Sequence, residues 1–258
     1  PPTTTPRNPL VAKTAKTDRQ AKIDQIRSKQ KGAERRRGFM IVGVCVVIAL
    51  LIVGAAAYRP IMNWWELRKF EDLGVASIGA PASVCAEVET KPANGSSEHV
   101  PTDTPVPYED SPPAFGPHWN EPGVAPAPME RKLYTEGDRP ELESLVHNLE
   151  HGYTILWYDE TIAGDDEAMQ TLRGITGKFT DDSNFRNKFI AAPWTSSDGK
   201  PFPDGQHVAI THWSAGGEGA AEGSQEGVWQ YCSEVSGAAL EDFMLEYPYT
   251  DSPEPDAA

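Results

Sequence analysis

What the sequence lacks narrows the chemistry that it can carry. The chain of 258 residues has three cysteines and five methionines, without a C-x-x-C-H haem-attachment motif or a methionine cluster suited to cuprous copper. It also lacks a P-loop, a dinucleotide-binding fingerprint and the G-x-S-x-G turn of serine hydrolases. Nucleotide-binding, covalent haem and serine-hydrolase functions therefore have no support in the sequence.

One stretch of the chain contains no charged residue. The 21 residues from Gly38 to Tyr58 are mostly Val, Ile, Leu and Ala, and a helix of this length spans about 31 Å, close to one bilayer core. The stretch begins too far into the chain for an ordinary signal peptide, and it has no clear A-x-A cleavage site. We interpret it as one transmembrane helix, with a buried core helix as the alternative.

Positive charge is abundant before this stretch and scarce after it. Residues 1–37 carry eleven Lys or Arg against three acids, whereas residues 59–258 carry 12 basic and 35 acidic residues. Arg35, Arg36 and Arg37 directly precede the apolar stretch. The positive-inside rule then predicts a single-pass protein of the cell membrane, with a cytoplasmic N-terminus and an extracytoplasmic C-terminal part. The acidic exterior argues against nucleic-acid binding.

These patterns divide the chain into four expected parts. They are a basic cytoplasmic tail over 1–37, a transmembrane helix over 38–58, a juxtamembrane helix over 59–74 and an extracytoplasmic histidine-containing domain over 75–258. The tail is too polar to fold alone, and an anionic bilayer surface or a partner protein would suit its charge. Trp64 and Trp65 lie where an outer aromatic belt would be, so they join the three arginines as predicted membrane-anchoring residues.

Hydrophobic periodicity predicts the elements of the external domain. Helices are expected over 139–152, 165–179 and 236–247, and strands over 153–158, 188–194 and 206–213. The preceding segment up to residue 140 is rich in Pro and Gly and has little periodic pattern, and we interpret the acidic C-terminal residues as a frayed end. The prediction is one compact α+β domain.

Two of the three cysteines lie outside the apolar stretch. Cys45 is inside it, whereas Cys85 and Cys232 lie near the start and the end of the external domain. In an oxidising compartment an even count predicts one disulfide, which would clip the two ends of the domain together. A metal-binding role for the pair is the alternative.

All six histidines lie in the external domain, and four of them form the candidate metal site. His147 and His151 are four residues apart on an expected helix, so both rings share one face. His118 lies in S-P-P-A-F-G-P-H-W, whose prolines stiffen the backbone, and His99 precedes this segment. Imidazole ligands suit zinc or copper, and the sequence does not decide between them.

The competing interpretation gives these histidines ordinary structural roles. His147 and His151 lie near the end of a helix, where cations are favoured in any case. His207 and His212 are five residues apart on an expected strand and point to opposite faces, so we interpret both as structural or surface residues.

The helix histidines also belong to the pattern H-x-x-E-H of a class of zinc peptidases, in which the glutamate, here Glu150, activates water. Gly152 and an expected strand follow at once, which leaves little more than two helical turns for the motif. In that class a further carboxylate downstream completes the zinc site. The candidates for it here, Glu222 and Glu226, lie in a Gly- and Glu-rich loop. Zinc hydrolysis is therefore the third hypothesis, after the two functions that are given at the end of this subsection.

Two segments resemble a known family. They are H-V-P-T-D-T-P-V-P-Y-E-D-S-P-P-A-F-G-P-H-W and L-V-H-N-L-E-H-G, which with the flanking cysteines are similar to an actinobacterial "domain of unknown function" family of single-span membrane proteins. The resemblance covers about residues 85–245. It marks these positions: His99, Tyr108, Pro112, Pro113, Gly116, Pro117, His118, His147, Glu150, His151 and Gly152. Phe115 stands where the family signature P-P-x-S-G-P-H has serine, so any role of that hydroxyl is absent here.

The architecture is also similar to accessory subunits of actinobacterial cytochrome bcc–cytochrome oxidase supercomplexes. This similarity implies a non-catalytic, membrane-anchored accessory subunit that braces the outer face of an envelope complex, with subunits of a respiratory oxidoreductase and the lipid bilayer as partners. The alternative is an extracytoplasmic copper- or zinc-binding module that uses His99, His118, His147 and His151. The family label itself implies no established reaction.

Overall fold

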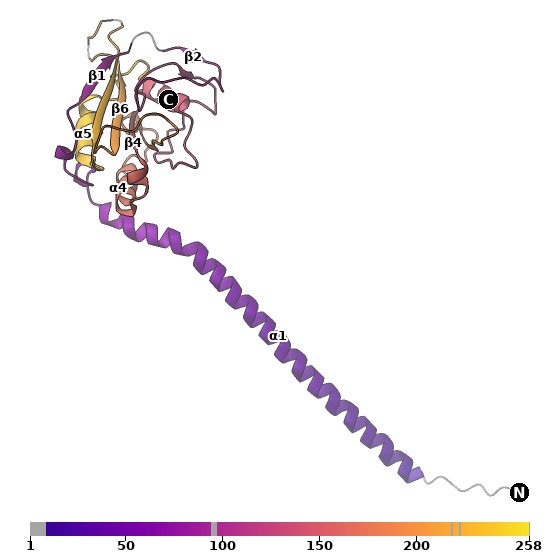
Figure 1. Ribbon diagram of the computed structural model, residues 1–258. Coiled ribbons are helices and arrows are strands. Elements are labelled where there is room, and N and C mark those ends of the chain that lie inside the picture. Colours follow the sequence, from indigo (N-terminus) through magenta and orange to yellow (C-terminus); the bar gives the residue numbers. More distant parts are fainter. Residues whose placement is uncertain (1–8, 94–96, 218, 222, 258) are drawn as a thin grey trace, which may run out of the picture. The chain divides into compact units, whose positions relative to one another are not determined.

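The computed structural model describes residues 9–93, 97–217, 219–221 and 223–257 (Figure 1). The chain forms two compact units, one ending at Trp64 and the other extending from Trp65 to Ala258. The finer division into a tail, a transmembrane helix and a juxtamembrane helix stays a prediction.

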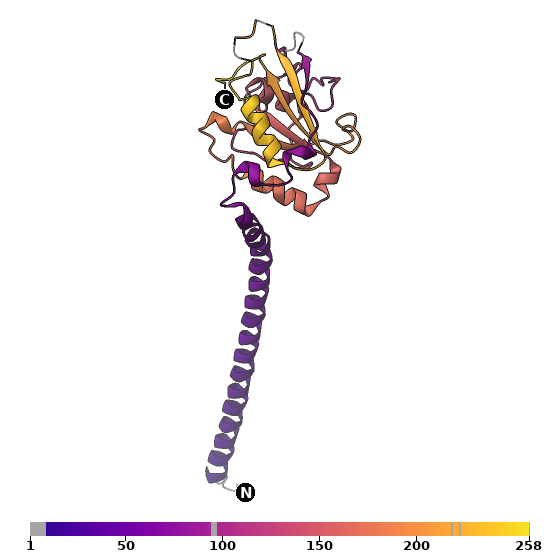
Figure 2. The ribbon, with the colours of Figure 1, turned by 90° about the vertical axis from the view of Figure 1, so that its left-hand side faces the viewer.

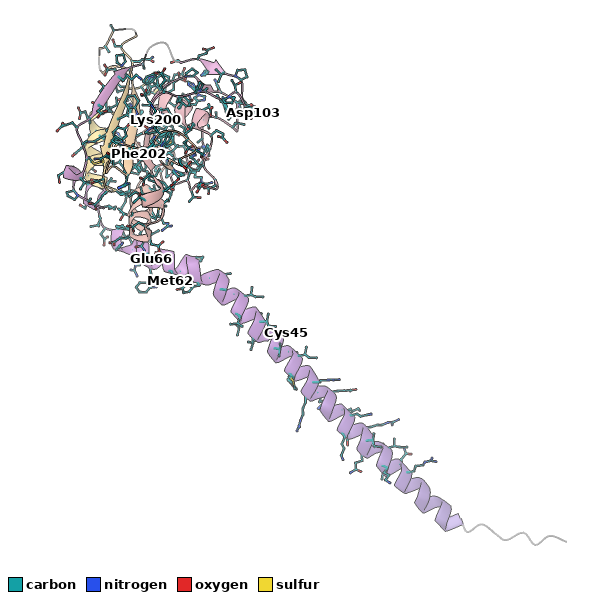
Figure 3. The ribbon with its side chains drawn as sticks, in the orientation of Figure 1. Cys45, Met62, Glu66, Asp103, Lys200 and Phe202 are labelled. Carbon is teal, nitrogen blue, oxygen red and sulfur yellow. A yellow bond between two sulfur atoms is a disulfide. The ribbon has the colours of Figure 1, made fainter. Side chains whose placement is uncertain are left out.

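The first unit is built from one helix, α1 (Pro9–Leu67), which also supplies the first residues of the second unit. This helix is long and apolar enough to cross a membrane. Its apolar side chains are exposed, and Cys45 projects from it with a free thiol (Figure 3). Over residues 38–58 α1 is hydrophobic all round, a pattern typical of a membrane span or of a buried core helix.

The segment 59–74, expected as a juxtamembrane helix, begins inside α1. α1 continues through Pro60 to Leu67, and a 3-10 turn, η1 (Arg68–Phe70), follows it directly. Trp65 is 61% exposed, and the side chain of Trp64 lies outside the described residues.

The second unit contains a five-stranded sheet in the order β1-β7-β6-β4-β5. β4 and β5 are parallel, and the other neighbours are antiparallel. Every residue of β4, β5 and β6 is buried, as expected for strands that are covered on both faces. The strands are β1 (Glu89–Pro92), β4 (Thr154–Tyr158), β5 (Phe189–Pro193), β6 (Val208–Ser214) and β7 (Glu226–Cys232).

Helices cover the two faces of this sheet. Leu156 of β4 packs in one core with α4 and α5, while its neighbour Trp157 packs in a second core with α2, because successive side chains of a strand point to opposite faces. Figure 2 shows α5 lying across the strands on its side of the sheet. The remaining helical elements are α2 (Leu142–Glu150), α3 (Glu160–Ala163), α4 (Asp166–Thr176), α5 (Gly237–Glu246), η2 (Val75–Ser77), η3 (Ala82–Val84) and η4 (Phe185–Asn187).

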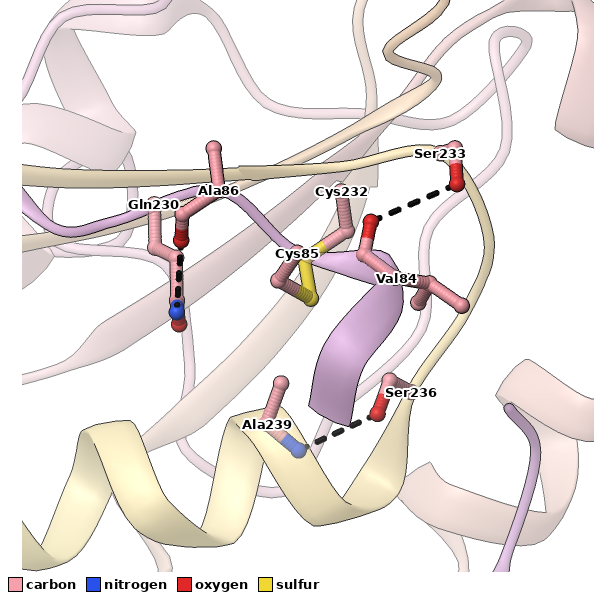
Figure 4. Close-up of a disulfide and its surroundings, with 8 residues drawn as sticks. All are labelled: Val84, Cys85, Ala86, Gln230, Cys232, Ser233, Ser236 and Ala239. Carbon is pink, nitrogen blue, oxygen red and sulfur yellow. Dashed lines mark hydrogen bonds between the residues drawn. A yellow bond between two sulfur atoms is a disulfide. The ribbon is translucent and has the colours of Figure 1, made fainter. Parts of the chain in front are cut away.

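The predicted disulfide is confirmed. Cys85, just after η3, is bonded to Cys232 at the end of β7, 147 positions further along the chain (Figure 4). The Ser233 hydroxyl and backbone N–H both donate to the carbonyl of Val84, which holds the same two segments together beside the sulfur atoms. The bond therefore joins the start of the domain to its sheet.

The α+β class and the six expected elements of the external domain are confirmed, with ends that differ by a few residues. β7 was not expected, because its first residues, Glu226 and Gly227, continue the composition of the Gly- and Glu-rich loop before it. β1 was not expected, because it lies in the segment rich in Pro and Gly. The expectation of a frayed C-terminus is wrong: the Lys188 ammonium group donates to the carbonyls of Pro255 and Ala257 and fixes this segment.

Candidate metal centre

Two short strands place His99 and His118 side by side. β2 (His99–Val100) and β3 (His118–Trp119) pair in parallel, with His99 opposite His118, and the two ring centroids are 4.9 Å apart. The connection between the strands turns at Asp103, which has a φ of 67° (Figure 3). Trp119 Nε1 donates to the carbonyl of Thr104 and closes this loop.

The residues before His118 fix its backbone. Gly116 has a φ of 141°, and a Cβ there would lie 2.8 Å from the ring of Tyr108, so only glycine suits both the backbone angle and the space. The Tyr108 hydroxyl donates to the carbonyl of Pro117. Phe115 packs against the ring of Trp229.

The helix α2 supplies the other side chains from its last turn. His147 and Glu150 lie on α2, and His151 is its C-cap. Their spacing of three and four residues brings all three to one side of the helix. The Nδ1 atom of His147 lies 2.6 Å from the carbonyl oxygen of Trp119, which docks this turn against β3.

Four ligand atoms converge between α2 and the two short strands. One atom from each of His99, His118, His147 and Glu150 lies within 4.8 Å of the others. Glu150 Oε2 is 2.9 Å from His118 Nε2 and 3.6 Å from His99 Nε2. His118, His147 and Glu150 are buried, whereas the side chain of His99 is 42% exposed, so the cluster reaches solvent at His99.

His151 stands at the edge of this cluster. Its Nε2 atom is 2.9 Å from His147 Nε2 and 3.6 Å from Glu254 Oε2. Glu150, His151 and Glu254 form a second group whose ligand atoms lie within 4.8 Å of one another. The structure thus gathers the four predicted histidines in two overlapping groups rather than in one set, and it adds two carboxylates.

Backbone carbonyls orient two of the rings. The carbonyls of Gly116 and Trp119 can only accept hydrogen bonds, so the Nδ1 atoms of His118 and His147 beside them carry the protons. In neutral rings the Nε2 atoms then present lone pairs to the cluster. Metal-binding histidines are held in this way by a partner on the second nitrogen.

When the neutral ring of His118 carries its proton on Nδ1, no proton lies between His118 Nε2 and Glu150 Oε2. His118 Nε2 and Glu150 Oε2 are both buried and have no hydrogen-bond partner among the described residues. They face each other at 2.9 Å, which is favourable only when a proton or a metal cation lies between them. A metal cation can therefore take the place of a proton between these two atoms.

The charges also suit a cation. Burial would raise the pKa of Glu150, but its interactions with His118, Ser97 and His147 lower it to about 2. Burial is the main cause that lowers the pKa of His147, and the nearby rings of His151 and His118 add to it, so that this pKa is about 4. At neutral pH the cluster therefore offers a carboxylate and a neutral imidazole, the forms that bind metals.

The sequence predicts the histidines as ligands but not the carboxylates. Its H-x-x-E-H pattern gives Glu150 only the role of a catalytic base, although its place between the two helix histidines puts it on their side of α2. Glu254 had no sequence signal, since it lies about a hundred residues from the motif. The other two histidines are elsewhere: His207 contacts Asp159, and the buried His212 lies beside the carbonyls of Tyr153 and Asp251.

The described residues can hold a metal ion: three imidazoles and a carboxylate form the donor set, in which the buried atoms His118 Nε2 and Glu150 Oε2 face each other. Searches of curated proteins and of solved structures find no match. The model of one protein family, described as a protein of unknown function, DUF3105, matches residues 99–258, which begin at the first histidine of the cluster. The chain therefore belongs to the DUF3105 family.

Proposed function

We propose that this protein is a membrane-anchored metal-binding module, which holds a zinc or cupric ion in its external domain. The observation that carries the proposal is the convergence of His99, His118, His147 and Glu150 within 4.8 Å. Two of these rings are already oriented by backbone carbonyls, so little reorganisation is needed on binding.

The donor set favours borderline metals. Imidazole nitrogen and carboxylate oxygen suit zinc and cupric copper, whereas cuprous copper prefers thiolate and thioether ligands. The external cysteines are consumed in the disulfide, so they are not thiolate donors. A tetrahedral ion with bonds of about 2.0–2.1 Å separates its ligand atoms by about 3.3 Å. The contacts of Glu150, 2.9 Å to His118 and 3.6 Å to His99, bracket that value.

The charge pattern and the disulfide favour a position of this module outside the cell. The charge-free part of α1 follows Arg35, Arg36 and Arg37, which favours a cytoplasmic N-terminus. The disulfide between Cys85 and Cys232 supports the same orientation, since such bonds persist in oxidising compartments.

The test is zinc affinity of the full-length chain in detergent. Removal of a residue that only hydrogen-bonds to a metal ligand costs about 10–100-fold in metal affinity. Because His118→Ala removes a ligand itself, we expect it to weaken zinc binding by about 100-fold or more. Competition with a chromophoric chelator measures this change. His207→Ala is the matched control, because His207 contacts Asp159 outside the cluster and should leave the affinity unchanged. Equal zinc affinity in wild type and His118→Ala would refute the proposal.

The hydrolase hypothesis assigns Glu150 a different role. In the H-x-x-E-H peptidases the glutamate acts on a water molecule and the two histidines bind zinc. Here the carboxylate of Glu150 lies 2.9 Å from His118 Nε2, within the group of candidate ligands. This contact favours a ligand role for Glu150, and it is why we propose binding rather than hydrolysis.

Membership of a respiratory assembly stays a prediction that is compatible with metal binding. It rests on the basic N-terminal segment, the single apolar helix and the acidic external domain. Affinity purification of the tagged chain in mild detergent should recover oxidoreductase subunits in stoichiometric amounts, because the helix and the domain would both contact them. Recovery of the chain alone, from cells whose oxidase complexes stay intact in that detergent, would contradict the prediction.

A further inference from the structure

We propose that the centre holds two metal ions and that Glu150 bridges them. The first ion is the one already assigned to His99, His118 and His147, so this inference rests on the proposed function. The second would be held by His151 and Glu254 on the other side of the Glu150 carboxylate.

The number of donors is the first argument. A structural zinc ion takes four protein ligands, whereas this cluster supplies six side chains. Their ligand atoms form two groups, and Glu150 is the one member that both groups share. The six side chains are His99, His118, His147, Glu150, His151 and Glu254.

The position of His151 is the second argument. Its Nε2 atom lies only 2.9 Å from His147 Nε2, yet it belongs to the group with Glu254 and not to the group with His99. His147 presents a lone pair from Nε2, because its proton is on Nδ1 beside the Trp119 carbonyl. His151 Nε2–H is then the donor to His147 Nε2 in this structure. When His151 gives up that proton, each imidazole can bind one of two neighbouring ions.

The C-terminal segment is held so that Glu254 stays at the site. The backbone N–H of Glu254 donates to the carbonyl of Glu150 at 2.9 Å. The buried ammonium group of Lys188 donates to the carbonyls of His151, Pro255 and Ala257, at distances of 2.6 to 2.8 Å. Lys188 therefore ties the end of α2 to the residues that follow Glu254. A side chain on a backbone fixed on both sides is suited to be a ligand.

A carboxylate is suited to bridge. Each of its two oxygens can bind a different ion, and two-metal sites of proteins hold their ions about 3.5–4 Å apart. Glu150 is buried and belongs to both groups, and each group has one exposed member, His99 in the first and Glu254 in the second, whose side chains are 42% and 52% accessible. The paired centre would thus be reached from solvent at both ends.

The experiment counts zinc per chain. Full-length protein in detergent is stripped with a chelator, loaded with zinc, passed through a desalting column and analysed by mass spectrometry of the metal. We expect two zinc ions in wild type and one in Glu254→Gln, a change at an exposed side chain. Glu241→Gln, an exposed carboxylate on α5, is the matched control and should keep two.

The outcomes separate the two proposals. One zinc ion in both wild type and Glu254→Gln would overturn the bridged pair while the single-ion site stands. Two zinc ions in Glu254→Gln would also overturn it, since Glu254 would then not be a ligand. No retained zinc in wild type would refute the proposed function itself.

Discussion

Gly152→Ala is expected to lower the free energy of unfolding of the external domain by about 2–5 kcal/mol. Gly152 has a φ of +88°, which costs a non-glycine residue about 1–2 kcal/mol. A Cβ there would also overlap the carbonyl oxygen of Tyr249 and lie 2.8 Å from the hydroxyl oxygen of Ser252. Overpacking of this kind costs about 1–3 kcal/mol more. Urea unfolding followed by tryptophan fluorescence measures the sum.

A second glycine separates the two causes. Gly205 has a φ of +76°, but nothing lies within 4 Å of a Cβ built there. Gly205→Ala should therefore cost only the backbone part, about 1–2 kcal/mol. Equal losses for Gly152→Ala and Gly205→Ala would show that the C-terminal segment does not pack against the end of α2 as described.

Removal of the disulfide is the second change that is expected to lower the stability of the external domain by a large amount. Cys85 and Cys232 are 147 positions apart, and closing a loop of this length stabilises a fold by about 4–5 kcal/mol in the chain-entropy model. The double variant Cys85→Ser/Cys232→Ser should lose about that much, as measured by urea unfolding without reductant. Cys45→Ser is the matched control, because Cys45 carries a free thiol on α1.

Reduction of the wild-type protein gives the same comparison without a substitution. Thermal unfolding with and without dithiothreitol should show a lower midpoint for the reduced chain, and the Cys45→Ser variant should behave like wild type. An unchanged midpoint after complete reduction would contradict the account of how the start of the domain is held to its sheet.

Local patterns were sufficient to predict much of the fold. The helix 139–152 is predictable because its apolar residues recur at helical spacing, and the strand after it because its residues form a continuous, mostly apolar run. Gly152 marks the boundary between the two. The disulfide followed from the count of external cysteines. The histidine pair on α2 followed from a spacing of four, which local helix geometry converts directly into proximity.

The rest of the site depends on contacts between distant segments. His99 meets His118 because two-residue strands pair, and no periodicity shows in so short an element. Glu254 reaches the centre because Lys188, buried just before β5, binds carbonyls of the C-terminal segment. Backbone carbonyls carry no sequence identity, so such a contact leaves no pattern to recognise.

The most direct test of the central claim is X-ray absorption spectroscopy of the zinc-loaded full-length chain. We predict a shell of nitrogen and oxygen atoms at about 2.0–2.2 Å together with the outer-shell scattering of imidazole rings. The imidazole scattering should weaken in His118→Ala and persist in His207→Ala. Zinc surrounded by oxygen alone, without imidazole scattering, would show that the ion binds the acidic surface and that the histidine cluster is not a metal centre.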